Sequence, residues 1–261
     1  MLVIGVGVAF SAKSHAEDIP LDILHLQIQE LYGEGKFKEA IPLAEKVVAL
    51  TKRSKGDGDP ETAGSLNDLA ELYQATGDYA KAEPLFKEAV KICQKVFGRV
   101  CPETEAILNN LAGLYQATGD YAKAEPLCKE ALEICQKVLD PRDPETARAL
   151  HNLAALYSAI GDYAKAEPLG KKALEIYQKV LGPQNPDTVQ ILSDLAMDYV
   201  GLNDYTKAEP LLKQALKIRQ KILGPRHPNT ARSLSNLAQL YVAMGDYACA
   251  LAAYFRKRGT R

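Results

Sequence analysis

The sequence predicts an all-α protein built as an α-solenoid of stacked antiparallel helix pairs, and two ladders of recurring residues predict it. The segment Gly-Asp-Tyr-Ala-Lys-Ala-Glu-Pro-Leu occupies residues 77–85 and returns at 119–127 and 161–169, with diverged copies starting at Asn203 and Gly245. A second ladder of prolines keeps the same 42-residue spacing, at Pro60, Pro102, Pro144, Pro186 and Pro228. A period of about 20–50 residues is typical of repeat proteins, in which each unit buries its apolar face against its neighbours.

Each unit contains the signals of two helices. The first helix is expected to begin at Pro60, because proline suits a first helical turn and Asp59 before it is a good N-cap. Its apolar stripe has helical spacing and consists of Leu66, Leu69, Ala70 and Tyr73. Gly77 is expected to end this helix in the left-handed conformation, with Asn203 as the one substitute. The second helix is expected to run from Asp78 to about Phe97.

The same signals divide the chain. Residues 17–58 are interpreted as a degenerate first helix pair and a loop, 59–226 as four full 42-residue repeats, and 227–261 as a shortened terminal repeat. Residues 1–16 begin with an apolar run that is too short to span a bilayer. Two interpretations are open for them: an export signal, which would make the protein periplasmic or secreted, or an apolar N-terminal segment of a cytoplasmic protein.

Composition and motifs argue against several classes of function. The 32 basic and 33 acidic residues give a net charge of −1, whereas nucleic-acid-binding proteins usually carry a basic excess. The four histidines and five cysteines show no metal-ligand spacing, and neither a phosphate-binding loop nor a nucleophile elbow is present. We therefore predict a protein that is not an enzyme, with no catalytic, cofactor-binding or metal-binding residues.

The repeated residues resemble a known family. Leu69-Ala70, Tyr73, Gly77-Asp78-Tyr79 and Ala82 are similar to the tetratricopeptide repeat, whose usual unit has 34 residues. The 42-residue length, Asn-Asn-Leu-Ala at 109–112 and Leu-Gly-Pro-x-x-Pro at 223–228 resemble its kinesin light chain subtype. The resemblance implies a right-handed superhelix. The near-identity of adjacent repeats is typical of bacterial arrays of this kind.

The resemblance also implies where a partner binds, because the first helices of such repeats line a concave groove. Helical spacing places the variable positions of these helices on that side. The candidate groove residues are Asn67, Asn109, Arg148, His151, Gln190, Met197, Arg232 and Ser235. Arg148 and Arg232, with Gln190 and His151, are expected to form a basic strip that binds an acidic residue of the partner, while the N-terminal half of the groove is expected to be uncharged. A neighbouring row that includes Asn110 and Asp194 is expected to tie successive units together.

We therefore predict a scaffold that binds a protein or peptide segment in this groove. One alternative is a regulatory or sensor module that takes a small ligand or a signalling peptide. Another is a fragment of a larger multidomain protein, since the pattern is lost after Ala248. The shortened last unit lacks the polar face that usually covers the end of a solenoid. It is therefore expected to fray or to self-associate.

Overall fold

The computed structural model describes residues 20–258, with side chains described from 20 to 253, and these residues form twelve α-helices and no strand. The helices are α1 (Leu21–Gly33), α2 (Phe37–Lys55), α3 (Pro60–Ala75), α4 (Tyr79–Phe97), α5 (Pro102–Ala117), α6 (Tyr121–Val138), α7 (Pro144–Ala159), α8 (Tyr163–Val180), α9 (Pro186–Gly201), α10 (Tyr205–Leu223), α11 (Pro228–Ala243) and α12 (Tyr247–Arg258). None of these helices is long and apolar enough to cross a membrane.

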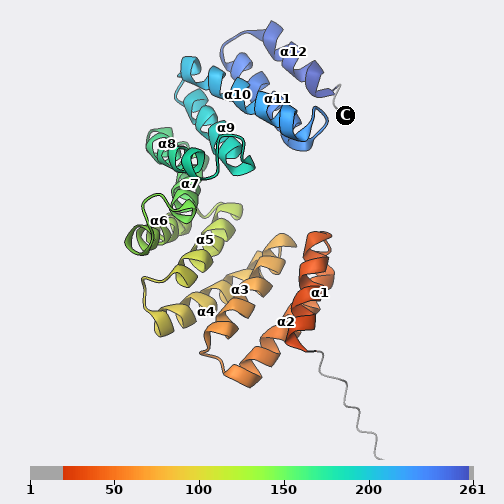
Figure 1. Ribbon diagram of the computed structural model, residues 1–261, viewed down its shortest axis with the longest axis vertical. Helices are drawn as coiled ribbons and strands as arrows, with labels where there is room; N and C mark the ends of the chain where they lie inside the picture. Colours follow the sequence, from red (N-terminus) through yellow and green to blue (C-terminus); the bar gives the residue numbers. More distant parts are fainter. Residues whose placement is uncertain (1–19, 259–261) are drawn as a thin grey trace, which may run out of the picture.

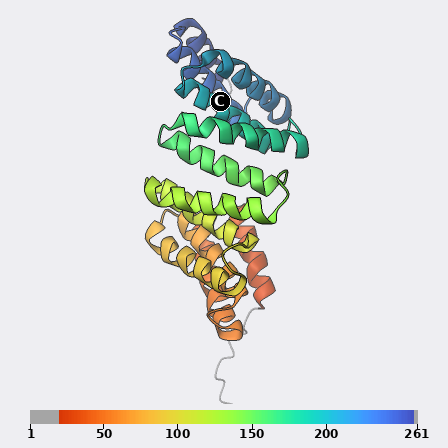
Figure 2. The same ribbon diagram turned by 90° about the vertical axis from the view of Figure 1, so that its left-hand side faces the viewer.

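Consecutive helices pack as antiparallel pairs, and the pairs stack into an open arc (Figure 1). The odd-numbered helices lie along the inside of the arc and the even-numbered helices along the outside. From the outer side, successive helices form a staircase that turns gradually along the stack (Figure 2). The predicted all-α solenoid of stacked helix pairs is confirmed.

The helix ends follow the expected local chemistry. Asp59, Asp143 and Asn185 each accept a hydrogen bond at 2.8–2.9 Å from the backbone N–H two residues later, which satisfies one orphan donor of the first turn. Cys101 stands at the equivalent position without capping, because its thiol donates to the Glu103 carboxylate instead. The first helix of each repeat is followed by a left-handed residue, and Asn203 (φ 59°) is the one non-glycine with positive φ among the described residues.

Leucines at equivalent positions of the inner helices form the centre of one continuous core. Leu72, Leu114, Leu156 and Leu240, which are spaced by one or two repeats, are each at most 1% exposed. Such side chains stabilise the folded chain by about 1.5–3 kcal/mol each. The corresponding residue of α9 is Asp198, which is the exception in this row.

A repeated polar contact joins neighbouring units at four of the five boundaries between the described helix pairs. Tyr115, on α5, donates its hydroxyl hydrogen to Glu83 Oε1 on α4 at 2.8 Å. Tyr157 and Tyr241 make the equivalent bonds to Glu125 and Glu209 at 3.0 and 3.1 Å. The glutamates also pair with a lysine one turn later, such as Lys87 at 2.6 Å from Glu83. Each contact fixes the rotation of one helix pair against its neighbour.

The last described helix leaves apolar side chains uncovered. Tyr79, Tyr121, Tyr163 and Tyr205 are half-buried, whereas the equivalent Tyr247 is 67% exposed. Leu251, one turn further along α12, is 55% exposed. No helix pair follows α12 within the described residues to cover them. Self-association through this unit stays a prediction.

The tyrosine–glutamate contact generates a stability prediction. Tyr115→Phe should lower the free energy of unfolding by about 1 kcal/mol, because a nearly buried hydroxyl loses its bond to a carboxylate. The measurement is denaturant unfolding of the variant beside the parent. Tyr121→Phe is the matched control, since the Tyr121 hydroxyl has no hydrogen-bond partner among the described residues. Equal stabilities of the two variants would contradict the assigned role.

Candidate functional site

In the N-terminal half of the chain, polar side chains of neighbouring inner helices bond to one another, and a cavity of about 610 Å³ lies between α1, α2 and α3. A second cavity lies in the C-terminal half. In the N-terminal half, Asn110 donates to Asn67 at 3.0 Å and to Glu71 at 2.6 Å, both on the preceding inner helix. Asn67 also donates to Glu71, and Asn109 donates to Glu105. Asn110 thus joins two units, as expected for its row, but through side chains.

Arg148 is already held by carboxylates of the chain. Its guanidinium lies 3.2 Å from Glu105 on α5 and also contacts Glu145 on its own helix. Glu105 is 4% exposed and stands where two other repeats have the buried alanines Ala63 and Ala147. Burial raises the pKa of Glu105, while the charge of Arg148 opposes this shift. The Glu105–Arg148 ion pair therefore joins α5 to α7.

The two arginines of the predicted basic strip differ in their surroundings. Arg148 is paired with Glu105 and Glu145, whereas the half-exposed Arg232 has its nearest carboxylate, Asp194, at 3.8 Å. The N-terminal half is not uncharged, because Glu71 lies among its amides. The physical reason is that neighbouring inner helices pair their polar side chains across the unit boundary. Each set of equivalent repeat positions, considered alone in the sequence, does not reveal this pairing.

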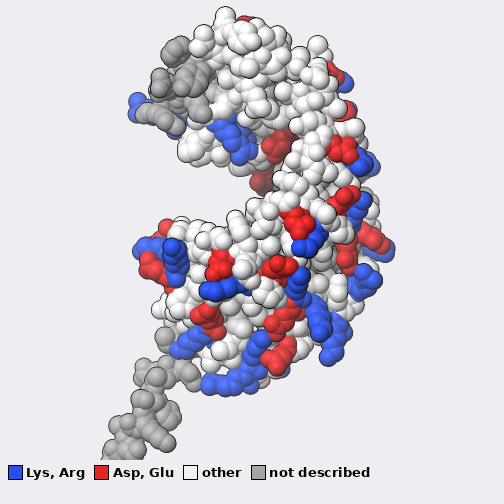
Figure 3. Space-filling model, turned by 180° about the vertical axis from the view of Figure 1, so that it is seen from behind, with Lys and Arg blue, Asp and Glu red and all other residues white. Residues whose placement is uncertain are grey.

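In the C-terminal half, α7, α9 and α11 border a cavity of about 600 Å³. Its lining residues are Ala155, Ser158, Ala159, Tyr163, Gln190, Asp194, Met197, Asp198, Val200, Gly201, Arg232 and Gln239. The space-filling view shows the hollow of the arc bordered by both acidic and basic side chains on its upper side (Figure 3). A volume of this size is within the range of ordinary ligand pockets.

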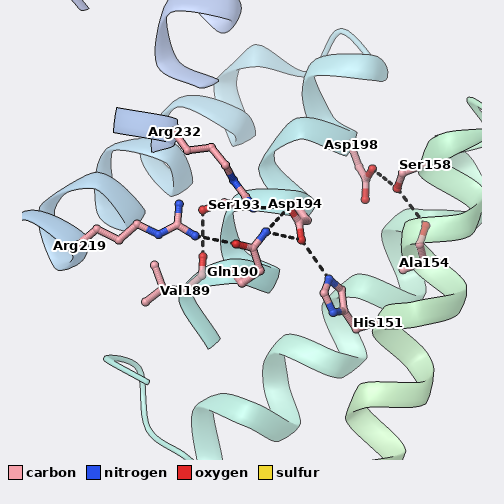
Figure 4. A network of polar contacts seen from close by, with 10 residues as sticks. All are labelled: His151, Ala154, Ser158, Val189, Gln190, Ser193, Asp194, Asp198, Arg219 and Arg232. Atoms are coloured by element: carbon pink, nitrogen blue, oxygen red, sulfur yellow. Dashed lines mark hydrogen bonds and ion pairs between the residues drawn. The ribbon is translucent and has the colours of Figure 1, made fainter. Parts of the chain in front are cut away.

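Asp194 is the centre of the polar network that borders this cavity (Figure 4). Gln190 Nε2 donates to both of its carboxylate oxygens, at 2.7 and 2.8 Å, and His151 Nε2 lies 3.0 Å from Oδ2. Arg232 approaches to 3.8 Å from α11. The carboxylate of Asp194 is therefore satisfied by groups from three inner helices.

Arg219, on α10, bonds to this network without lining the cavity. It is 5% exposed, donates to Gln190 Oε1 at 2.9 Å and donates to Ser233 at 2.8 Å. No carboxylate within the described part of the chain lies at ion-pair distance from it. Arg219 holds the Gln190 amide in one orientation through its bond to Oε1, and its charge also interacts with Asp194. Gln190 then presents its Nε2 group to Asp194.

Asp198 is the second carboxylate of the cavity and differs from Asp194 in being poorly satisfied. The Oγ of Ser158 lies at hydrogen-bonding distance from both Asp198 Oδ1 and the Ala154 carbonyl oxygen. A hydroxyl has one hydrogen, so both contacts are satisfied when Asp198 is protonated and donates to Ser158. Burial raises the pKa of Asp198 from 3.8 to about 6, and the nearby charge of Asp194 adds to the effect.

Tyr163 and Gly201 form one wall of the cavity. A Cβ added to Gly201 would lie 2.4 Å from the Tyr163 ring, so the ring occupies the space that a side chain would need. The other repeats have alanine at this position: Ala75, Ala117, Ala159 and Ala243. Gly201 therefore lets the Tyr163 ring approach α9 more closely than an alanine would permit.

The predicted groove residues are only partly brought together. Gln190, Met197 and Arg232 line the cavity, and His151 reaches it through Asp194. Asn67 and Asn109 lie on α3 and α5, Arg148 is paired, and Ser235 donates to Ala231 on its own helix. Sequence reasoning missed Asp198, Arg219 and Gly201. The signal that could have found them is a change of residue type at a repeat position. Asp198 replaces leucine, Gly201 replaces alanine, and Arg219 is charged where earlier repeats have cysteine or tyrosine.

The pKa of Asp198 generates a prediction for stability. Its folded-state pKa is raised, so the folded chain binds the proton more tightly, and this contribution to stability is lost as pH rises from about 4 to about 6. Asp198→Asn should therefore raise the free energy of unfolding at pH 7 by roughly 1–3 kcal/mol, with a smaller gain near pH 4. The measurement is denaturant unfolding across this pH range.

Asp187→Asn is the control for that experiment, because it removes the same charge from an exposed position of the same helix. A gain that does not change with pH, or a less stable Asp198→Asn variant at pH 7, would contradict the assigned ionisation.

Comparisons with known proteins agree with this fold. The tetratricopeptide repeat family model matches residues 30–95, 103–179, 161–221 and 187–254. None of the curated proteins matches the chain. Among solved structures, BtubC from P. vanneervenii is 26% identical with a TM-score of 0.69, and the match covers 91% of each chain.

Two further structures are similar. A putative kinesin light chain from Podosopora anserina with nearly identical repeats is 29% identical with a TM-score of 0.66, over 77% of this chain and 95% of that one. A Rap protein complexed with competence and sporulation factor shares the fold at 17% identity and a TM-score of 0.64, over 92% of this chain and 74% of that one. The family model spans well over half of the sequence, and the chain belongs to the tetratricopeptide repeat family.

Proposed function

We propose that this chain is an interaction scaffold that binds a protein or peptide segment over the cavity between α7, α9 and α11. The observation that carries the proposal is the cavity itself, in which apolar side chains and incompletely satisfied polar groups face the same hollow. The tetratricopeptide repeat is a general protein–protein interaction fold, and the chain belongs to this family. On this proposal the chain acts by binding rather than by catalysis.

Arg232 is the group that we assign to an acidic residue of the partner. Its side chain is 50% exposed, and its nearest carboxylate, Asp194, is 3.8 Å away and already accepts bonds from Gln190. The guanidinium fork therefore keeps donors for a second carboxylate, which arginine can hold with two parallel bonds. Arg148 is unsuited to this role because Glu105 and Glu145 already pair with it.

Apolar contact would come from Met197 and Val200, which line the same cavity as Arg232. Val242, near the other end of α11 from Arg232, is 53% exposed. Methionine is common at binding surfaces because its flexible side chain adapts to different partners. An extended or short helical segment could place apolar side chains here and one acidic side chain at Arg232.

A regulatory module that binds a small ligand is the second candidate. The observation that favours it is the volume of about 600 Å³, which suits a small molecule as well as two or three side chains of a peptide. Native mass spectrometry of the purified protein separates the two candidates, since a small ligand that survives purification would appear as a fixed added mass.

The scaffold proposal is tested with a tagged chain used to capture its partner from the source cells. The captured segment is then titrated against the parent and against Arg232→Ala and Met197→Ala variants. Arg232→Ala should weaken binding roughly tenfold or more, and more strongly at low salt, because a charge-assisted bond is lost. Met197→Ala should weaken binding at all salt concentrations, because the loss is apolar.

Lys217→Ala, at an exposed position of the outer helix α10, is the matched charge-removing control, and it should bind the partner as the parent does. Retained affinity in both cavity variants, together with loss of binding on changes at Asn67 or Asn109, would place the site in the N-terminal half instead.

A further inference from the structure

Asp198 stands where four other repeats have a buried leucine on their inner helix. The equivalents are Leu72, Leu114, Leu156 and Leu240, each at most 1% exposed, and Asp198 itself is 3% exposed. Replacing a core leucine by a carboxyl group removes apolar burial and adds the cost of desolvating a polar group. Packing within the fold gives no reason for this residue, because a leucine is accommodated in four equivalent units.

One oxygen of this carboxyl group has no partner in the protein. Oδ1 is bonded to Ser158, while Oδ2 makes no hydrogen bond or ion pair with any described residue. The residue lines the cavity, and Figure 4 shows its second oxygen pointing away from Ser158. A nearly buried carboxyl group with a free oxygen beside a cavity is suited to accept a hydrogen bond from a donor group of a bound molecule.

The other charged groups near Asp198 do not supply that donor. Asp194, one turn earlier on α9, and Glu167 on α8 are both acidic, and both raise the pKa of Asp198. His151 on α7 is bonded to Asp194, and Arg232 on α11 points toward Asp194 as well. The surroundings of Asp198 are therefore acidic, whereas Arg232 supplies a positive charge from α11.

We infer that Asp198 recognises the ammonium group of a lysine side chain from the bound segment. The inference rests on the proposed function and names a second recognition element for it. Lysine fits better than arginine, because a single free oxygen suits a compact point charge and cannot hold both arms of a guanidinium fork. The methylene stem of the lysine would lie along Met197, Val200 and Ala155, as lysine stems commonly do on apolar surface.

The partner segment would then carry a lysine and an acidic residue at different points. With lysine at Asp198 and the acidic residue at Arg232, the site distinguishes the order of the two charges along the segment. A segment with the reversed order would set like charges against each other at both ends. Ionisation of Asp198 also links binding to pH, so that lysine binds more weakly below about pH 6.

Two blocked amino acids test the inference without knowledge of the partner. N-acetyl-lysine methylamide and N-acetyl-norleucine methylamide have the same carbon stem and differ in the ammonium group. Each is titrated into the full chain, and the methyl signals of Met197 and Val200 are followed by NMR. Lysine amide should bind with a dissociation constant on the order of 1 mM at pH 7.5, as expected for a ligand of this size. Norleucine amide should bind at least tenfold more weakly, which is roughly the effect of one charge-assisted bond.

The variants identify the residue responsible. Asp198→Asn, which keeps the shape of the side chain, should abolish the preference for the lysine amide, and the exposed Asp187→Asn should retain it. Lowering the pH to 5 should weaken lysine binding by roughly tenfold in the parent and leave Asp198→Asn unchanged, because binding requires the ionised carboxylate. N-acetyl-arginine methylamide should bind more weakly than the lysine amide.

Equal binding of the lysine and norleucine amides, a preference that survives in Asp198→Asn, or unshifted Met197 signals at tens of mM (well beyond the expected dissociation constant) would each overturn the inference. These outcomes leave the scaffold proposal standing, because capture of a partner and its loss in the Arg232 and Met197 variants are measured separately. Failure of that capture experiment with a selective lysine response would instead reject the scaffold and keep the cation site.

Discussion

Every helix pair in this chain has apolar surface on both sides, and the rest of the structure depends on covering both against neighbouring pairs. This constraint fixes the same residue types at the same positions of each unit, from the alanines that allow close approach to the leucines of the inner row. The tyrosine–glutamate hydrogen bonds also restrict the rotation of one unit against the next. A unit therefore cannot change its orientation without disturbing the next.

The positions free of this constraint are those on the inner side of the arc, and the chain uses them in two ways. Between α3, α5 and α7, polar side chains bond to one another, as Glu105 does with Arg148, while Asn109 Oδ1 and Arg148 Nε are buried without a partner. Such internal pairs contribute little net stability, since desolvation offsets much of their attraction. Between α7, α9 and α11, the same positions border a cavity, and donors and acceptors there remain available. The difference lies in the residues, because the backbone repeats in both halves.

The sequence predicted the fold well because its signals are local and repeated. The prolines, the Asp and Asn caps, and the left-handed Gly77 and Asn203 each fix a helix end by short-range chemistry. The candidate site was predicted less well. Arg232 and Met197 do lie at the cavity, but the pairing of Arg148 with Glu105 depends on two side chains 43 residues apart meeting across a unit boundary. Composition and spacing along one helix cannot determine which of several polar neighbours will meet.

In a repeat protein, however, equivalent positions of the other units show which residue types packing requires. A position that departs from those residue types is therefore informative. Asp198 in a row of leucines, Arg219 where earlier units have Tyr177 or Cys135, and Gly201 in a row of alanines are all on α9 or α10. Each replaces a residue that the fold accepts elsewhere, and two of them place a polar group in nearly full burial. Residues that break a local rule without a gain in stability tend to mark functional positions. Asp198 and Gly201 line the cavity between α7, α9 and α11, and Arg219 bonds to Gln190 in its wall, which supports the proposal of recognition there. The buried Glu105 on α5 shows that such departures also occur in the N-terminal half.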